Sequence, residues 1–455
     1  MKQLVDKVSC SVIITLEDGT NIDISLVTGG SISAIKNYIT SLEVLESTNA
    51  QNKNPVGVVS SNTVKITLNS NDRTLLPDNE QSPYYGKMNT NAKVKVTVTD
   101  DDGSVTFNTF YVSSWVSNIS SDNPTQVVIE ATDLLSIINK NAVTGGEILK
   151  DVGTRSVFLE MLTRINSEMP EKYKLKYNET DITFNRYPYI EATNFDASNI
   201  STWFNTLCQS TLTNLYLTRE DLLVTDDCLD DKQSESVCTL SDKVNITRAS
   251  VDKGGLVNYN SVKVNYVINS ANAVTRLPTM SGQVLTPGVN TLDNINIGSS
   301  IYKLAYVQVV SDSKILVEIE SVSYSKNTAT IVLKNNAQAN VTCDIEIYGQ
   351  SVKENKRFVT KNKSSSGNET LEVTNSILPS SYIESFANNL LRLIGIRAST
   401  LSISGYFNPR IKLGDTVYVD TEKSINAKGY YKITELKWKI SNVLKCEAKV
   451  VKTIV

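Results

Sequence analysis

The chain has 455 residues, of which 40% are apolar and 20% charged, a balance typical of a globular protein with several hydrophobic cores. Its net charge of −3 argues against a protein that binds nucleic acid by neutralising many phosphates. Because the sequence contains no histidine, Ser-His and Cys-His nucleophile pairs are excluded, together with the most common zinc ligand.

The first region, residues 1–145, repeats short runs of alternating apolar and polar residues, which predict strands with one buried face. Residues 10–26 predict a hairpin that turns at Asp18-Gly19. Further strands are predicted at VKITL, VKVTVT, VTFNTFYVSSWVSNI and TQVVIEAT. The sequence DDDG at 100–103 suits a tight turn, although three adjacent carboxylates also offer ligands to a hard cation.

The connection between VKITL and VKVTVT is longer than twenty residues and contains QSPYYGKM at 81–88. Connections of this length in a compact domain are uncommon and usually functional or disordered, and the apolar residues here disfavour disorder. Pro83 fixes the backbone and Gly86 permits a sharp exit. Between them, Tyr84 and Tyr85 add amphipathic contact area. The loop either folds over its own barrel or clasps a neighbouring subunit, and we favour the clasp.

Residues 146–243 have a different pattern and predict a mixed α/β domain. Apolar residues at helical spacing mark 155–169 and 198–211, with a tyrosine-rich segment between them. We interpret the aromatic stripe as core packing rather than a cofactor site. Four aspartates cluster at 225–232, where a solvated turn is favoured over a calcium loop because the loop spacing is missing.

Strands then resume, and residues 271–370 predict a small inserted β-sandwich domain. Because of this insertion, the strand at 259–268 is predicted to pair with strands after residue 395. A helix and four short strands close the chain, so residues 244–270 plus 371–455 are predicted to form one unit.

No catalytic or cofactor motif occurs in the sequence: phosphate-binding loops, dinucleotide fingerprints, zinc-protease motifs and nucleophile elbows are all absent. A carboxylate pair for glycoside hydrolysis is an alternative, but Glu191, Asp196 and Glu220 resemble ordinary surface acids. The six cysteines have no C-x-x-C spacing, which predicts free thiols. The sequence has no run of about 18 apolar residues, which a membrane-spanning helix would require. We therefore expect a protein without enzymatic activity, metal or cofactor.

Two segments carry motifs in a recognisable order. In the first, a long loop with P-x-N and S-P-Y-Y-G precedes a strand that ends near a tryptophan and a strand that closes in A-x-D-x-L. In the second, a helix precedes N-P-x-x-x-x-G-D-x-V and a closing hairpin. The matching residues are Pro77, Asn79, Ser82, Pro83, Tyr84, Tyr85, Gly86, Trp115, Ala131, Asp133 and Leu135, then Asn408, Pro409, Gly414, Asp415, Val417, Tyr431, Ile433 and Trp438. Together they resemble the hub proteins of bacteriophage tail tips and baseplates.

That family comprises the hubs of contractile tails and is related to the N-terminal region of the tail-associated proteins of siphophages. The resemblance implies a mainly β fold with α+β elements. Its parts would be two tube-type β-barrels (1–145, and 244–270 plus 371–455), a mixed α/β domain (146–243) and an inserted β-sandwich (271–370). Candidate subunit-interface or structural residues are Pro83, Tyr84, Tyr85, Gly86, Trp115, Asp133, Pro409, Gly414, Asp415 and Trp438.

The function implied by the resemblance is that of a structural virion protein, the central hub of the tail tip or baseplate. Three copies would form a homotrimeric ring between the sixfold tail tube and a threefold spike or fibre. The implied partners are further copies of the chain, tail tube or distal tail proteins, a spike or central fibre protein, and phage DNA in transit. The implied location is the virion tail, assembled in the host cytoplasm.

Other functions remain open. The inserted sandwich and its tyrosines suit a receptor- or carbohydrate-binding tail module, and the hub of a phage-tail-like bacteriocin would carry the same motifs. A cell-wall hydrolase is disfavoured, because the sequence ends at Val455 directly after the predicted barrel strands.

Overall fold

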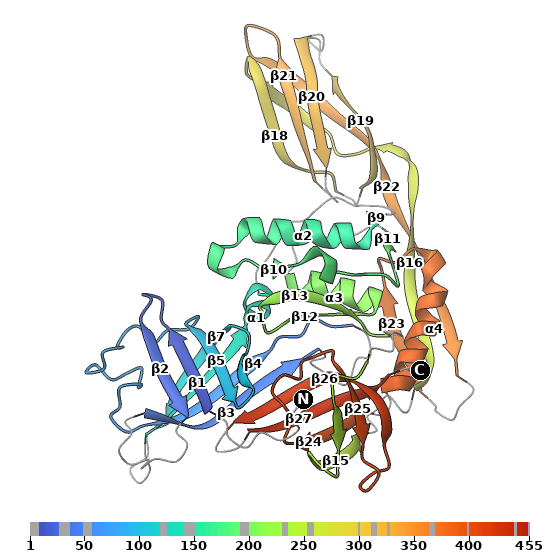
Figure 1. The fold of residues 1–455 in the computed structure, drawn as a ribbon. Helices are drawn as coiled ribbons and strands as arrows, with labels where there is room; N and C mark the ends of the chain where they lie inside the picture. Colours follow the sequence, from blue (N-terminus) through green and yellow to red (C-terminus); the bar gives the residue numbers. More distant parts are fainter. Residues whose placement is uncertain are drawn as a thin grey trace.

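The computed structural model describes residues 9–26, 37–48, 57–118, 125–140, 152–191, 200–229, 235–252, 259–298, 301–310, 316–324, 328–363, 369–397, 400–440 and 444–453. Within these ranges the buried apolar residues form three clusters. Figure 1 shows the corresponding parts: a large curved sheet, a middle unit of helices and short strands, and a distal unit at the far end of two long strands. The predicted mainly β fold with a few helices is confirmed.

The large sheet contains 14 strands that come from both ends of the chain. Its first half consists of β1 (Ser9–Thr15), β2 (Asn21–Leu26), β3 (Asn37–Ser47), β4 (Thr63–Ser70), β5 (Lys93–Asp100), β6 (Gly103–Thr106), β7 (Phe110–Asn118) and β8 (Gln126–Asp133). Its second half consists of β14 (Thr239–Ser241), β15 (Ile246–Asp252), β24 (Thr400–Gly405), β25 (Thr416–Asp420), β26 (Lys428–Ile440) and β27 (Leu444–Lys452).

Alternation in the sequence gives each of these strands one buried face. In β4, Val64, Ile66 and Leu68 lie in the core, whereas Lys65 and Thr67 lie on the opposite face. Each large apolar side chain buried in this way contributes about 1.5–3 kcal/mol. The strands predicted at VKITL, VKVTVT and TQVVIEAT are therefore confirmed as β4, β5 and β8.

The two halves meet at a seam where β3 pairs antiparallel with β26. Val44 lies opposite Trp438 and Leu45 opposite Lys437 in this register. Hydrogen bonding continues without interruption from β15 at one end of the path to β2 at the other, and one apolar cluster spans both halves. The regions predicted as two barrels thus share one sheet, and the predicted division into four domains stays a prediction.

The middle unit packs its helices around a second core. It contains α1 (Leu134–Ile138), β9 (Val152–Gly153), α2 (Thr154–Glu168), two 3₁₀ turns (Glu171–Tyr173 and Glu179–Asp181), β10 (Lys176–Tyr177), β11 (Tyr189–Ile190), α3 (Ile200–Thr211), β12 (Thr213–Leu217), β13 (Leu222–Asp227), β23 (Glu369–Asn375) and α4 (Ser380–Arg397). The aromatic residues predicted as core lie there: Phe158 and Phe204 are fully buried, with ring centroids 5.5 Å apart.

Two long strands, β16 (Tyr259–Arg276) and β22 (Val341–Asn362), run from the middle unit into the distal unit (Figure 1). The prediction that 259–268 pairs with strands after residue 395 is wrong. The strand β16 pairs antiparallel with β22 on one edge and parallel with β23 on the other. Because both of its edges are occupied by these nearer strands, no edge remains for a later one.

The distal unit encloses the third core between two sheets. One sheet continues β16 and β22 with β17 (Met280–Leu285) and β19 (Ile301–Val310). The other contains β18 (Gly288–Asn296), β20 (Val317–Tyr324) and β21 (Thr328–Asn335). Ile331, Leu333, Ile345 and Ile347 are buried between the two sheets. This arrangement gives the unit a core of its own, separate from the large sheet.

Candidate assembly interface

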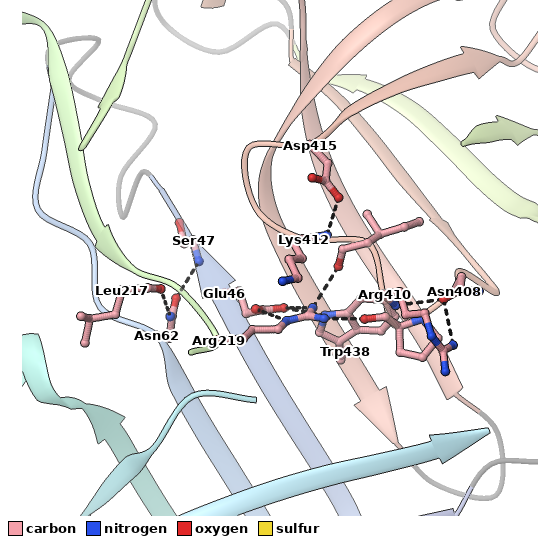
Figure 2. A network of polar contacts seen from close by, with 12 residues as sticks. Glu46, Ser47, Asn62, Leu217, Arg219, Asn408, Arg410, Lys412, Asp415 and Trp438 are labelled. Carbon is pink, nitrogen blue, oxygen red and sulfur yellow. Dashed lines mark hydrogen bonds and ion pairs between the residues drawn. The ribbon is translucent and has the colours of Figure 1, made fainter. Parts of the chain in front are cut away.

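A buried ion pair lies at the seam between the two halves of the large sheet (Figure 2). Arg219, in the turn after β12, donates from Nε to Glu46 Oε1 at 2.7 Å and from Nη2 to Glu46 Oε2 at 2.5 Å. The indole Nε1 of Trp438 donates to the same Oε2 at 2.9 Å. The two charged side chains are only 4% and 3% exposed. Since β3, β26 and the middle unit each contribute one residue, this contact connects all three.

The Arg219 guanidinium also contacts groups other than Glu46 at the seam. It donates to the carbonyl oxygens of Pro409 at 2.5 Å and Ile411 at 3.0 Å, and its central carbon lies 4.7 Å from the Phe107 ring centroid. Burial acts most strongly and lowers the pKa of Arg219, but the charge and hydrogen bonds of Glu46, together with smaller contributions from Cys446 and Asp415, leave the pKa raised. A buried charge is costly unless it is paired and hydrogen-bonded, so this geometry holds the seam together only when both partners are present.

The segment that supplies these carbonyls contains three predicted residues: Pro409, Gly414 and Asp415. Gly414 has a φ of +80°, and a Cβ at this position would lie 3.2 Å from the Tyr216 hydroxyl. Asp415 accepts a hydrogen bond from the backbone N–H of Lys412 at 2.8 Å, and burial raises its pKa. The motif N-P-x-x-x-x-G-D therefore folds into a fixed connection against the seam (Figure 2).

A path of eight strands crosses the seam in the order β15-β24-β27-β26-β3-β4-β8-β7. Every neighbouring pair in it is antiparallel. Among the described residues, β15 pairs with β24 alone, and Ser114–Asn118 of β7 pair with β8 alone. Over the residues that the structure describes, the path therefore has two free edges, at β15 and at Ser114–Asn118 of β7, which present backbone donors and acceptors to another strand.

One face of this path, which we call the polar face, carries lysines and glutamates in cross-strand pairs. The pairs are Lys65–Glu130 (2.9 Å), Lys437–Glu43 (3.0 Å), Lys439–Glu447 (2.7 Å) and Lys449–Glu435 (3.0 Å). The four lysines and four glutamates cancel in charge. Between them lie the hydroxyls of Ser402, Thr67 and Thr132. The face is polar and, over these pairs, electrically neutral, and it also carries the exposed Lys445, Arg248 and Asp252.

The predicted loop packs against its own half of the sheet. Leu75, Leu76 and Met88 are buried, and the indole Nε1 of Trp115 donates to the Leu75 carbonyl at 3.1 Å. Ser82 fixes the turn by donating from its hydroxyl to the Thr74 carbonyl at 2.5 Å. Because Trp115 belongs to β7, this packing places the loop beside a free edge of the eight-strand path.

Within the loop, the predicted residues differ in exposure. Tyr84 packs against the core, whereas Tyr85 is 48% exposed. Pro83 lies on the exposed surface, and Gly86 has a φ of +72°, as expected of a sharp exit. Of the two alternatives for this loop, self-packing is present, while the clasp stays a prediction that rests on the exposed ring of Tyr85.

Asp133 lies away from the other predicted residues, at the end of β8. Its carboxylate caps α1 and accepts from the backbone N–H groups of Asn62 at 2.7 Å and Ser136 at 3.4 Å. Asn62 in turn accepts from the Ser47 N–H at 3.2 Å and donates to the Leu217 carbonyl at 3.1 Å (Figure 2). Complete burial raises the pKa of Asp133 to about 7. This residue therefore fastens the large sheet to the middle unit.

Several of the predicted acidic residues that are described pair with basic residues, and Asp226 lies in strand β13 rather than in a turn, whereas Asp196, Asp230 and Asp231 lie outside the described residues. Asp100, in the DDDG turn, receives two hydrogen bonds of 2.8 Å from Arg410, and Asp226 lies 2.6 Å from Lys432. Glu220, considered as a hydrolytic acid, lies 2.6 Å from Lys412. No group of three potential metal ligands occurs among the described residues. None of the helices in the described part of the chain is long and apolar enough to cross a membrane.

Sequence reasoning missed both partners of the buried ion pair. Arg219 stands in a polar turn, TREDLL, where nothing distinguishes it from a solvated arginine. Glu46 did leave a signal, because it occupies a core-facing position in the alternation Leu42, Val44, Glu46. An acid at such a position requires a buried partner.

No protein-family model matches the chain, and no curated protein matches its sequence. Solved structures do match. A tail protein from Neisseria meningitidis MC58 has a TM-score of 0.54 at 10% identity, covering 97% of this chain and 96% of that one. The 43 kDa tail protein of prophage MuSo2 from Shewanella oneidensis has a TM-score of 0.53 at 9% identity, covering 97% and 98%. The fold of this chain is that of phage tail proteins, so the predicted resemblance is confirmed at the level of the fold.

Proposed function

We propose, from the phage tail-protein fold of this chain, that it is a structural hub subunit, three copies of which form a ring in the tail tip or baseplate. The observation that carries the proposal is the eight-strand path, with its two free edges and its ion-paired polar face. In this proposal the chain has no enzymatic role and needs no cofactor. The partners are further copies of the chain, the tail tube and a spike or fibre protein.

The strand count supports closure of a ring. With eight antiparallel strands in the path, β7 runs opposite to β15, so the β15 of a second copy placed beside β7 continues the antiparallel alternation. Three copies would contribute 24 strands and leave neither end of the eight-strand path open. A heterologous contact of this kind closes into a ring when the rotation between copies fits.

The symmetry of such a ring suits a connection between a sixfold tube and a threefold spike or fibre. Each chain brings two halves of similar construction, joined at the seam, so three chains present six sheet segments. One rim of the ring can then match a sixfold tube while the ring itself keeps threefold symmetry for a spike or fibre. The middle and distal units, present once per chain, would carry the threefold contacts.

The polar face suits a channel for DNA. Four of its lysines are each held within 3.0 Å of a glutamate, and Asp252 partly offsets the further charges of Lys445 and Arg248, so the face offers little net positive charge to phosphates. A surface without a basic excess binds nucleic acid weakly, which permits passage. We infer that this face would line the lumen of the ring.

Cysteine cross-linking between the free edges tests the ring. Val116 on β7 is 47% exposed and Ser250 on β15 is exposed, and both lie on the polar face. A Val116→Cys, Ser250→Cys chain treated with a bismaleimide should give covalent dimers and trimers at high protein concentration or in assembled particles. All six native cysteines are free thiols, so the unmodified chain and each single variant serve as controls.

A matched control keeps Ser250→Cys and moves the other cysteine to Val289, which is 61% exposed on the distal unit. This pair should give no trimer. Threefold rings in negative-stain images would support the proposal independently. Cross-linking equal to that of the control pair, together with particles that contain only monomers of this chain, would contradict it.

A further inference from the structure

The distal unit carries an aromatic platform on the outer face of one sheet. Tyr306 of β19 and Tyr348 of β22 are direct neighbours in the strand register. Their ring centroids are 4.6 Å apart and their planes differ by only 16°, so the rings are stacked. Tyr306 remains 50% exposed, whereas Ile345 and Ile347 of the same sheet point into the core. The platform therefore faces solvent, away from the apolar core.

A polar frame holds this platform in place. Glu346 Oε2 accepts from the Tyr348 hydroxyl at 2.9 Å and from Gln308 Nε2 at 2.6 Å. Glu346 Oε1 lies 2.6 Å from Arg276 Nη2, and Arg276 Nε donates to Thr279 at 2.9 Å. The Glu346 side chain is 13% exposed and its pKa is lowered by the hydrogen bonds from Gln308 and Tyr348. The frame is thus ordered before any ligand arrives.

Fold stability alone accounts poorly for this arrangement. A cross-strand aromatic pair is only one of several side-chain pairs that stabilise a sheet modestly. Here Tyr306 stays 50% exposed although one face of its ring lies against Tyr348, and the polar side chains of Arg276, Gln308 and Glu346 lie at the edge of the pair. A flat exposed ring bordered by fixed donors and acceptors is a recognition surface.

We propose that the Tyr306–Tyr348 platform binds a pyranose ring of a neutral glycan. One face of a pyranose consists of C–H groups, which pack against an aromatic ring, while its equatorial hydroxyls form hydrogen bonds at the rim. Arg276, Gln308 and Glu346 lie where they can supply these hydrogen bonds.

Charge selects the class of ligand. The arginine and the glutamate of the frame neutralise each other across 2.6 Å, and Asp344, on the same face two residues before Glu346, leaves no basic excess to attract an acidic sugar. The preference is therefore for neutral hexopyranoses. This inference does not depend on the ring, because all of its residues lie in the distal unit of one chain.

Screening of the full-length chain on an array of neutral and acidic glycans tests the proposal, followed by calorimetry with the best neutral ligand. Tyr306→Ala should weaken binding by about tenfold or more, because the stacking surface is lost. Tyr306→Phe should bind nearly as the parent chain, since the ring face is kept. Gln308→Leu should weaken binding by a smaller factor.

Phe358→Ala is the matched control, because Phe358 is an aromatic residue of the same strand β22 that is 64% exposed. It should leave binding unchanged, and circular dichroism should show the same fold for all variants. The proposal is overturned if the parent chain binds no neutral glycan, or if Tyr306→Ala and Phe358→Ala affect binding equally.

Discussion

The large sheet and the distal unit are both antiparallel β structures with apolar cores, but they are attached to the rest of the molecule in different ways. The large sheet is tied to the middle unit by buried or half-buried polar contacts, among them Arg219–Glu46, Asn62–Leu217 and Lys432–Asp226. The distal unit is reached through β16 and β22, which simply continue into it (Figure 1).

The difference indicates a division of tasks. Side-chain contacts between units fix their relative position, which the proposed ring would need, because its free edges would have to meet the edges of the next copy. A unit carried on two continuous strands can change its outer face without disturbing those edges. Assembly and ligand binding would then reside in different regions, and variants can test each region separately.

The largest effect is expected from removing one partner of the buried ion pair. Arg219→Leu leaves Glu46 charged, buried and unpaired, which should lower the free energy of unfolding by about 3–5 kcal/mol. Urea unfolding followed by tryptophan fluorescence measures this change. Lys412→Ala, which removes a largely exposed ion pair with Glu220, should cost less than about 1 kcal/mol. Equal losses in the two variants would show that the seam does not depend on the buried pair.

A second tie can be tested through pH. The folded-state pKa of Asp133 is about 7, above its ordinary value of 3.8, so the folded protein binds a proton more readily between these values. The contribution of this group to stability therefore falls as pH rises from about 4 to 7 and stays low above that. Asp133→Asn should flatten this part of the pH profile while keeping a side chain that can cap α1. Urea midpoints at pH 5 and pH 8 measure the slope, and an unchanged slope would refute the assignment.

The exposed tyrosine of the loop separates folding from assembly. Tyr85→Ala should change the free energy of unfolding by less than about 0.5 kcal/mol, because the ring is 48% exposed. It should nevertheless reduce trimer cross-linking between the free edges. Tyr84→Ala, which removes a ring packed on the core, should lower stability as well. If Tyr85→Ala leaves cross-linking intact, the loop serves only its own half of the sheet.

The smallest effect is expected from removing the distal unit. Arg276 and Tyr348 are opposite each other in the β16–β22 register, so an Asn-Gly turn can replace residues 277–347 and close a hairpin. Thermal unfolding of the remaining chain and trimer cross-linking should both be unchanged. A large fall in Tm would show that the distal unit supports the rest of the molecule and that the two regions are not independent.

Local patterns predicted many elements well. Alternation located β4, β5 and β8, and helical spacing located α2 and α3, because these signals depend only on which face each residue buries. The exit of the loop at Gly86 could also be predicted, because a positive φ is a local requirement that favours glycine.

Pairing between distant segments could not be predicted in this way. The apolar faces of β16 and β22 show that both are strands, but nothing local states that they pair with each other over more than ten residues. The buried pair of Arg219 and Glu46 joins residues 173 positions apart, and only the acid lay on a core-facing position. Partner choice is decided by the assembled core, which a single sequence does not display.

The seam between β3 and β26 also determines when the fold can be finished. Glu46 and Trp438, which are in contact across the seam, are 392 residues apart in sequence, so this is one of the largest sequence separations possible in the chain. Contacts of high sequence separation form slowly, and the N-terminal strands leave the ribosome first. Until β26 has been synthesised, β3 keeps an open edge. Only a chain extended through Ile440 can close the seam, so a polypeptide truncated before β26 could not enter the proposed ring.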